Sequence, residues 1–252
     1  MGRKHKRLHV EEEDKKGFEA LEGTLTPEWW HKADDYQVKY ASTLEYAGIT
    51  LVDAKAGTGK TTIAVMVGLK LLKQGSVDIL RYVRFVDKRT QSLGFMPGAE
   101  GEKERGFMYP FFEAMEECGV STDATAKLIA NSVIELSTDI HLRGRNMKRT
   151  FLIIDESQNG SIEDLRLVLT RLHETGKGAV IGHSEQADRK LPKYGAFNLT
   201  PFQVYQRHLT KKPWAKICQL KVDYRGAYSQ WADEIGLTLQ ELEQEKYTFR
   251  SQ

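Results

Sequence analysis

The stretch Ile49–Thr62 reads ITLVDAKAGTGKTT: an apolar run, then a glycine-containing loop, then the start of a helix. The run Ile49–Val52 predicts a strand, and the periodic apolar residues of Lys60–Lys73 predict a helix packed against a sheet. A loop between a strand and a helix N-terminus can present several backbone N–H groups to one phosphate, with help from the helix dipole. This order of elements therefore predicts a phosphate-binding loop.

The loop matches the pattern G-x-x-x-x-G-K-[ST] at every fixed position except the first, where Ala54 replaces glycine. Gly57 and Gly59 allow the loop to curl with its N–H groups pointing inward. Lys60 is expected to reach the β- and γ-phosphates of a nucleotide, and Thr61 to offer its hydroxyl to Mg²⁺. The predicted nucleotide-binding residues of the loop are Ala54, Lys55, Ala56, Gly57, Thr58, Gly59, Lys60, Thr61 and Thr62.

A second chemical signal lies about 95 residues downstream, where the apolar run Phe151–Ile154 ends in two acids, Asp155 and Glu156. Four apolar residues in a row are typical of a central parallel strand that is buried on both faces. Ligands of such sheets bind at the carboxyl ends of the strands. We therefore expect Asp155 to hold Mg²⁺ and Glu156 to orient or deprotonate an attacking water.

Strand and helix signals alternate along the rest of the chain, which predicts an α/β fold with a mostly parallel sheet and helices on both faces. A helical region, broken once, is expected between Thr26 and Tyr46. Further strands are expected at Ile79–Val86, Val133–Leu136, Ala179–Ile181 and Ile217–Val222, and further helices at Tyr109–Cys118, Ser161–Leu172 and Tyr228–Glu245.

Composition narrows the class of protein. The 252 residues contain 37 Lys and Arg against 35 Asp and Glu. No run approaches the roughly 18 apolar residues of a membrane span, and no apolar stretch follows the basic N-terminus, so we expect a cytoplasmic protein. Two distant cysteines, Cys118 and Cys218, do not suit a disulfide scaffold. Charge blocks predict a mobile tail over residues 1–24, and residues 25–252 are expected to form a single ATPase domain.

Six segments in this order resemble the PhoH-like ATPases: AKAGTGKT, LGFMPG (93–98), LRGR (142–145), FLIIDESQN (151–159), LTRL (169–172) and VDYRG (222–226). The resemblance implies a three-layer, RecA-like P-loop fold close to that of superfamily-one helicases. It also implies ATP and Mg²⁺ as cofactors, ATP hydrolysis and a link to RNA metabolism. Some relatives carry a nuclease domain, which the short region before Thr26 does not lead us to expect, because a domain needs about 50 residues.

The chain departs from the family pattern at two places. Arg84-Phe85 replaces an Arg-Pro pair after the second strand. In the segment Gly182–Gln186, His183 replaces an acid, while Gln186 is kept. A glutamine there could read the γ-phosphate or its water, so Gln186 is a candidate catalytic residue; the alternative is an ordinary loop residue.

The resemblance also implies that Gln37, about 20 residues before the loop, reads the adenine edge. A glutamine amide offers both a donor and an acceptor, which suits adenine. The alternative is an ordinary helix surface residue. Trp29 and Trp30 are adjacent and cannot share one helical face, so we expect one in the core and the other at an interface or beside the base.

Phosphoryl transfer gains from an arginine aimed at the developing charge. Superfamily-one helicases supply it from a second RecA-like domain, for which this chain has no room, so the arginine must come from the same domain or from a neighbouring subunit. The second option implies a homo-oligomer such as a ring. Our first choice is Arg225, and the other candidates are Arg143, Arg145 and Arg171.

Two function classes stay open. Basic and aromatic residues interleave between a strand and the LGFMPG loop, a pattern that suits RNA or another single-stranded nucleic acid, although a charged strand edge would look the same. These residues are Arg81, Tyr82, Arg84, Phe85, Lys88 and Arg89. The alternative is a nucleotide-dependent regulatory or assembly ATPase that binds a protein. A small-molecule kinase ranks last, because no acceptor-binding signature is visible.

Overall fold

The computed structural model of the chain describes residues 21, 23, 25–86, 106–138, 146–184, 186 and 191–250. Several predictions therefore lie outside the described residues. These are most of the predicted tail over residues 1–24, the LGFMPG segment, Lys88, Arg89, Arg143 and Arg145. Leu21 is buried in the core, so packing begins before the predicted boundary at residue 25.

Six parallel strands form one sheet in the order β3-β2-β4-β5-β1-β6. Their bounds are β1 Ile49–Ala54, β2 Ile79–Arg84, β3 Ile134–Thr138, β4 Thr150–Asp155, β5 Lys177–Gly182 and β6 Ala215–Leu220. Every residue of β4 is buried, as expected for a central strand of a parallel sheet. The carboxyl ends of β1, β4 and β5 are neighbours, so loops that follow these strands share one edge.

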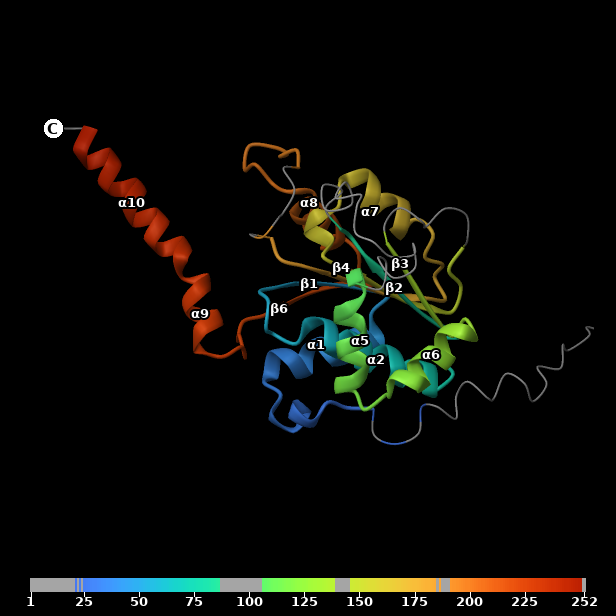
Figure 1. Cartoon of the computed structure of the whole chain (residues 1–252). Helices are drawn as coiled ribbons and strands as arrows, with labels where there is room; N and C mark the ends of the chain where they lie inside the picture. Colours follow the sequence, from blue (N-terminus) through green and yellow to red (C-terminus); the bar gives the residue numbers. More distant parts are fainter. Residues whose placement is uncertain are drawn as a thin grey trace, which may run out of the picture.

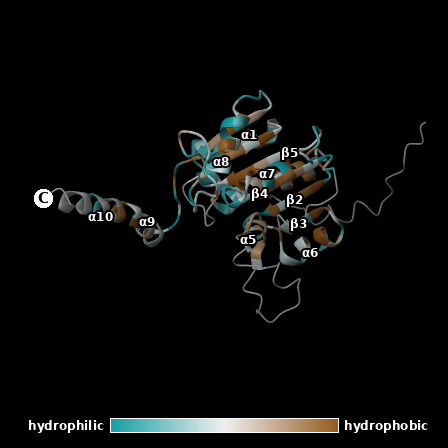
Figure 2. Ribbon diagram, turned by 90° about the horizontal axis from the view of Figure 1, so that it is seen from above, coloured by the Kyte–Doolittle hydropathy of each residue, from teal (hydrophilic) through white to brown (hydrophobic). Residues whose placement is uncertain are grey.

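Helices cover both faces of this sheet (Figure 1). One face packs against α1 Asp35–Tyr46, α2 Lys60–Lys73, α5 Tyr109–Glu117 and α6 Thr122–Ala130, and the other against α7 Ile162–Leu169 and α8 Pro201–Leu209. Hydrophobic colour is concentrated in the strands between the two helix layers (Figure 2). The three-layer α/β fold predicted from the sequence, that of a RecA-like P-loop NTPase, is confirmed.

The phosphate-loop helix α2 lies close against the sheet because of one small residue. A Cβ atom on Gly68 would stand 2.7 Å from a methyl of Leu80 on β2 and 3.0 Å from the ring of Phe151 on β4. Nine of the helix's 14 residues are buried, which anchors its N-terminus at the edge where β4 ends. A larger side chain at Gly68 would push the helix, and the loop before it, away from Asp155.

Some elements differ from the predictions. The region after Thr26 is broken as expected, into the short 3₁₀ helix η2 Glu28–Lys32 and α1. Two nine-residue helices, α6 and α8, were not predicted, although Ser121 caps the first and Thr200 with Gln203 forms a capping box on the second. The last predicted helix is two helices, α9 Ala227–Asp233 and α10 Ile235–Arg250.

The two C-terminal helices α9 and α10 extend away from the sheet and its covering helices (Figure 1). We call Ala227–Arg250 the C-terminal arm. Among the described residues, no helix is long and apolar enough to cross a membrane.

Candidate nucleotide site

The loop after β1 has the backbone that a phosphate site needs. Gly57 and Gly59 have φ angles of +78° and +77°, a conformation that glycine adopts without strain, and Gly59 is the N-cap of α2. The ammonium of Lys60 donates to the carbonyl of Lys55 at 3.1 Å, inside the loop. Burial lowers the pKa of Lys60, opposed in part by the nearby carboxylates. An anion in the loop would compensate this buried charge.

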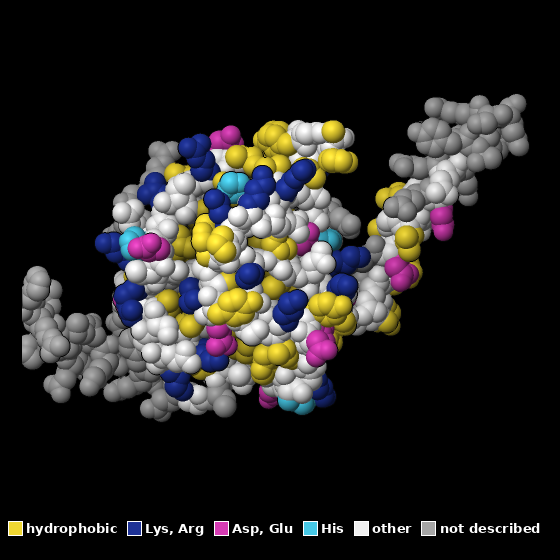
Figure 3. Space-filling model, turned by 180° about the vertical axis from the view of Figure 1, so that it is seen from behind, with side chains coloured by type: hydrophobic (Ala, Val, Ile, Leu, Met, Phe, Trp, Pro, Cys, Tyr) yellow, Lys and Arg dark blue, Asp and Glu magenta, His cyan; other side chains and the backbone are white. Residues whose placement is uncertain are grey.

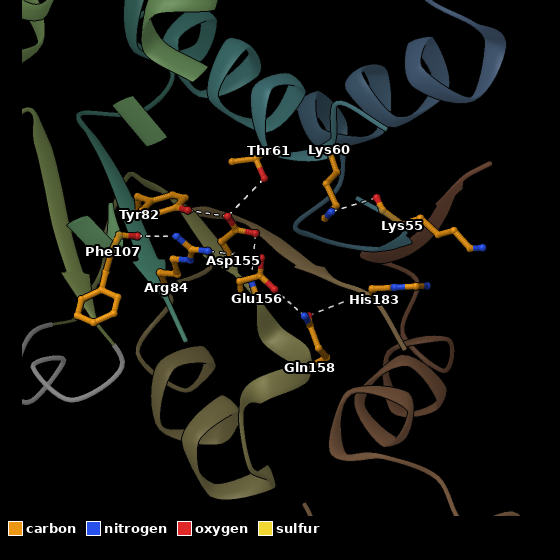
Figure 4. Close-up of polar contacts among 10 residues, drawn as sticks. All are labelled: Lys55, Lys60, Thr61, Tyr82, Arg84, Phe107, Asp155, Glu156, Gln158 and His183. Atoms are coloured by element: carbon orange, nitrogen blue, oxygen red, sulfur yellow. Dashed lines mark hydrogen bonds and ion pairs between the residues drawn. The ribbon is translucent and has the colours of Figure 1, made fainter. Parts of the chain in front are cut away.

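The carboxylate of Asp155 is buried where β4 ends, facing the start of α2 (Figure 4). Its Oδ2 lies 3.4 Å from the hydroxyl of Thr61 and accepts a 2.6 Å hydrogen bond from the phenol of Tyr82. Its Oδ1 accepts the N–H of Glu156 at 3.0 Å. The two predicted metal residues, Thr61 and Asp155, thus lie side by side, and the hydrogen bond from Tyr82 fixes the orientation of the Asp155 carboxylate.

This donor set fits Mg²⁺. A hydroxyl and a carboxylate are the oxygen ligands that Mg²⁺ prefers, and the ion usually takes its other ligands from water and substrate phosphates. Over the part of the chain that the structure describes, no cluster of three or more His, Cys, Asp or Glu side chains could hold a metal. Because Mg²⁺ needs few protein ligands when phosphates and water supply the rest, Thr61 and Asp155 are the residues that would hold it beside a nucleotide.

Glu156 sits in the left-handed region with φ +54°, a conformation that costs a non-glycine residue energy. Its Oε2 accepts a 2.6 Å hydrogen bond from the amide of Gln158, and its Oε1 lies 3.7 Å from the guanidinium of Arg84. Burial, together with the charge of Asp155, raises the pKa of the Glu156 carboxyl. The Glu156 carboxylate is therefore held between Gln158 and Arg84, and its role as a general base stays a prediction.

Gln158 joins two strand ends that the sequence did not show to be connected. Its amide nitrogen donates to Glu156, and its Oε1 accepts the backbone N–H of His183 after β5 at 3.1 Å (Figure 4). The side chain of Gln186 is exposed, and its backbone N–H donates to the carbonyl of His183. The structure thus points to Gln158 as a further site residue, and the role of Gln186 stays a prediction.

Gln37 is buried against the phosphate loop. Its Oε1 accepts the N–H of Asp34 at 3.1 Å in the capping box of α1, and its Nε2 donates to the carbonyl of Thr58 at 3.0 Å. A Cβ atom on Gly59 would lie 3.0 Å from the ring of Trp29. Gln37 and Trp29 therefore support the loop from the side, and the reading of adenine by Gln37 stays a prediction.

The segment Asp223–Arg225 lies on the other side of the same loop. The N–H of Tyr224 donates to the carbonyl of Gly57 at 3.0 Å, and its phenol donates to Asp34 at 2.7 Å. A Cβ atom on Gly57 would stand 2.1 Å from the carboxylate of Asp223 and 2.5 Å from Cγ of Arg225. Arg225 is thus beside the phosphate loop of its own chain, where its charge lowers the pKa of Lys60.

Other predicted residues lie away from the site. The carbonyl of Arg171 accepts the N–H of Met147, ahead of β4 and opposite the end that carries Asp155. The basic and aromatic cluster predicted after the second strand is wrong for its described members. Arg81 pairs with Glu135 on β3, and both Tyr82 and Phe85 are buried. The two rings are buried because helices cover both faces of the sheet: Tyr82 packs in the core on the α2 side and Phe85 in the core on the α7 side.

The sequence profile of the family described as PhoH-like protein matches residues 31–223, which hold the loop, Asp155 and Glu156. The chain belongs to the PhoH-like family. It is 31% identical to a "PhoH-like protein" of Bacillus subtilis, over an alignment that covers 62% of this chain and 48% of the relative. It is also 31% identical to a "PhoH-like protein" of Synechocystis, with 73% of this chain and 54% of the relative covered. It is 32% identical to "Protein PhoH2" of Bacillus subtilis (56% and 32%).

The chain spans about half the length of the PhoH-like proteins named first. Family membership and the loop geometry together indicate a P-loop protein that binds a nucleotide with a divalent cation. The match ends at residue 223, so Arg225 and the C-terminal arm lie beyond the matched residues.

Proposed function

We propose that the protein is an ATPase and that it acts on RNA or another single-stranded nucleic acid. The observation that carries the ATPase assignment is the meeting of four side chains at one edge of the sheet. Lys60 and Thr61 begin α2, Asp155 ends β4 and Glu156 follows it. The hydroxyl of Thr61 lies 3.4 Å from Asp155. These are the groups that cradle phosphates, hold a metal and activate water in phosphoryl transfer.

In this proposal the N–H groups of the loop and the ammonium of Lys60 bind the phosphates. Mg²⁺ bound with the nucleotide would supply positive charge to the phosphoryl oxygens. Tyr82 keeps Asp155 oriented toward Thr61 through its 2.6 Å hydrogen bond. Glu156 accepts a proton from the attacking water, once its carboxylate turns from Gln158 toward that water.

Arg225 is the arginine we assign to the developing charge, and its position beside Gly57 of its own chain supports action within one subunit. We expect Arg225→Ala to slow ATP hydrolysis by a factor of roughly 10 to 100, because one donor to the transferred phosphoryl group is lost at a partly exposed site. An equimolar mixture of Arg225→Ala and Glu156→Gln proteins should release phosphate at the sum of the two separate rates. Recovery well above that sum would instead show that the arginine acts across a subunit interface.

Support for a nucleic-acid partner comes from the charge of residues 189–222. This segment contains eight Lys and Arg residues and no Asp or Glu. Its described basic side chains are exposed, with Trp214 and Phe197 also 49% and 79% exposed. One face of the molecule carries Lys and Arg side chains between apolar patches (Figure 3). Exposed basic and aromatic side chains suit the backbone and the bases of a single strand.

The test compares ATP hydrolysis and binding with single-stranded RNA, with single-stranded DNA and with neither. We expect RNA to raise the rate and to bind with a salt dependence that Lys211→Glu with Lys212→Glu reduces by roughly 1 to 2 in log–log slope. The matched control, Lys127→Glu with Lys148→Glu, reverses two exposed lysines elsewhere and should behave as wild type. If neither RNA nor DNA changed the rate of ATP hydrolysis, the alternative would be favoured, a regulatory or assembly ATPase with a protein partner.

A further inference from the structure

The C-terminal arm exposes a stripe of large apolar side chains. Ile235, Leu239 and Leu242 follow one another on α10 at steps of four and three residues, the spacing of one helical face, and Tyr228 and Trp231 stand three residues apart on α9. Their exposed fractions range from 54% for Leu242 to 92% for Tyr228. Monomeric proteins rarely leave a contiguous apolar stripe of this kind in water, so such a stripe marks a surface that another element covers.

A groove on the domain has matching properties. It has a volume of about 380 Å³ and lies over α1 and α2, with apolar walls from Leu25, Trp30, Val38, Ala41 and Met66. This volume falls within the range of roughly 300–1,000 Å³ of small-molecule pockets, so the groove has room for anchor side chains of a helix but not for the helix itself. A helix that lays anchors at i, i+3 and i+7 into an apolar groove is a common mode of recognition.

The charges of the two surfaces are complementary. The arm sequence Ala227–Arg250 holds five acids against two bases, Lys246 and Arg250. Two of these acids, Glu234 and Glu241, have described side chains, and both are exposed. The charged side chains that line the groove are two lysines and one acid: Lys70 pairs with Glu45 at 2.8 Å, and Lys73 donates to the carbonyl of Gly23. An exposed ion pair of this kind is weak, so the lysines can exchange partners at small cost.

We propose that the C-terminal arm of one subunit docks into the α1–α2 groove of a second copy of this chain. The arm extends away from its own domain, so that domain does not cover the apolar stripe (Figure 1). In a second copy, the apolar walls of the groove would contact the stripe, and Lys70 and Lys73 would lie near the acids of the arm. Acid excess opposes pairing of two arms side by side and binding to anionic membranes or nucleic acid. The inference does not depend on ATP hydrolysis. The arm lies beyond the residues that match the family, whereas most of the groove lies within them.

Engineered disulfides between two differently tagged proteins test this geometry. One protein carries Leu239→Cys on the arm, the other Val38→Cys in the groove, and the natural Cys118 and Cys218 are buried. We expect mild oxidation of the mixture to form the mixed disulfide at least about tenfold faster than a control mixture in which Leu167→Cys on α7 replaces Val38→Cys. Equal rates in both mixtures would overturn the proposal. A protein that carries both Leu239→Cys and Val38→Cys would also overturn the proposal if it formed this disulfide within a monomer.

Mass measurement by light scattering gives an independent test. The wild-type chain of 28.7 kDa should run as a multiple of that mass at micromolar concentration, and Trp231→Glu with Leu239→Glu should shift it to the monomer. Lys70→Glu with Lys73→Glu should weaken assembly at least about tenfold, and adding Glu241→Lys should restore part of it. Tyr46→Ala, an exposed aromatic change outside the groove, serves as the control. A wild-type protein that stayed monomeric at every concentration would refute the docking of the arm into a second copy.

Discussion

Replacing Lys60 with alanine is expected to reduce ATP hydrolysis to the background of the assay and to weaken nucleotide binding. The Lys60 ammonium already lies inside the loop, donating to the carbonyl of Lys55 at 3.1 Å, and burial lowers its pKa. Binding of a phosphate anion would relieve this buried charge, so the lysine contributes both to affinity and to stabilisation of the transferred phosphoryl group. Phosphate release and the binding of a fluorescent ATP analogue measure the two effects separately.

Lys127→Ala, a change of an exposed lysine on α6, is the matched control and should hydrolyse ATP at the wild-type rate. Thermal unfolding of both variants shows whether the fold is kept. Wild-type turnover in a folded Lys60→Ala protein would contradict the assignment of the loop as the phosphate site.

Glu156→Gln is expected to keep nucleotide binding and to slow hydrolysis by a factor of about 10² to 10⁴, the usual contribution of a general base. The substitution preserves the shape of the side chain, and its amide oxygen can still accept the hydrogen bond from Gln158. Only the ability to take a proton from water is lost. Single-turnover measurements with bound ATP isolate this step from binding and product release.

Glu163→Gln on α7 changes an exposed carboxylate and should leave the rate unchanged. If Glu156→Gln instead lost nucleotide binding and kept normal turnover of what it bound, the roles given to Asp155 and Glu156 would have to be exchanged.

The parts of the site that lie on one continuous element were predictable from the sequence. A buried strand followed by two acids, and a glycine loop followed by an amphipathic helix, each place their own side chains. The contacts of Tyr82 with Asp155 depend on the register between β2 and β4, in which Arg84 stands opposite Asp155. Register is a tertiary property, so no local pattern showed that Tyr82 faces the site.

The same reason explains the wrong cluster after the second strand. The basic and aromatic residues in and after β2 suggested an exposed binding surface, because the sequence does not show which elements pack against that strand. With β3 beside it, Arg81 pairs with Glu135, and the helix layers on the two faces of the sheet bury Tyr82 and Phe85. The short helices α6 and α8 escaped prediction because nine residues give little periodicity, although their capping residues were visible.

The three residues Asp223–Arg225 give the phosphate loop a mechanical connection to the end of the chain. Tyr224 holds the carbonyl of Gly57, and the C-terminal arm begins two residues after Arg225. A shift of the loop upon phosphate binding would therefore change the direction in which the arm leaves the domain. If the arm joins two subunits, reciprocity between linked equilibria requires that assembly change nucleotide affinity by the same factor that the nucleotide changes assembly. Nucleotide binding in one subunit would then change how tightly its arm binds the neighbouring subunit.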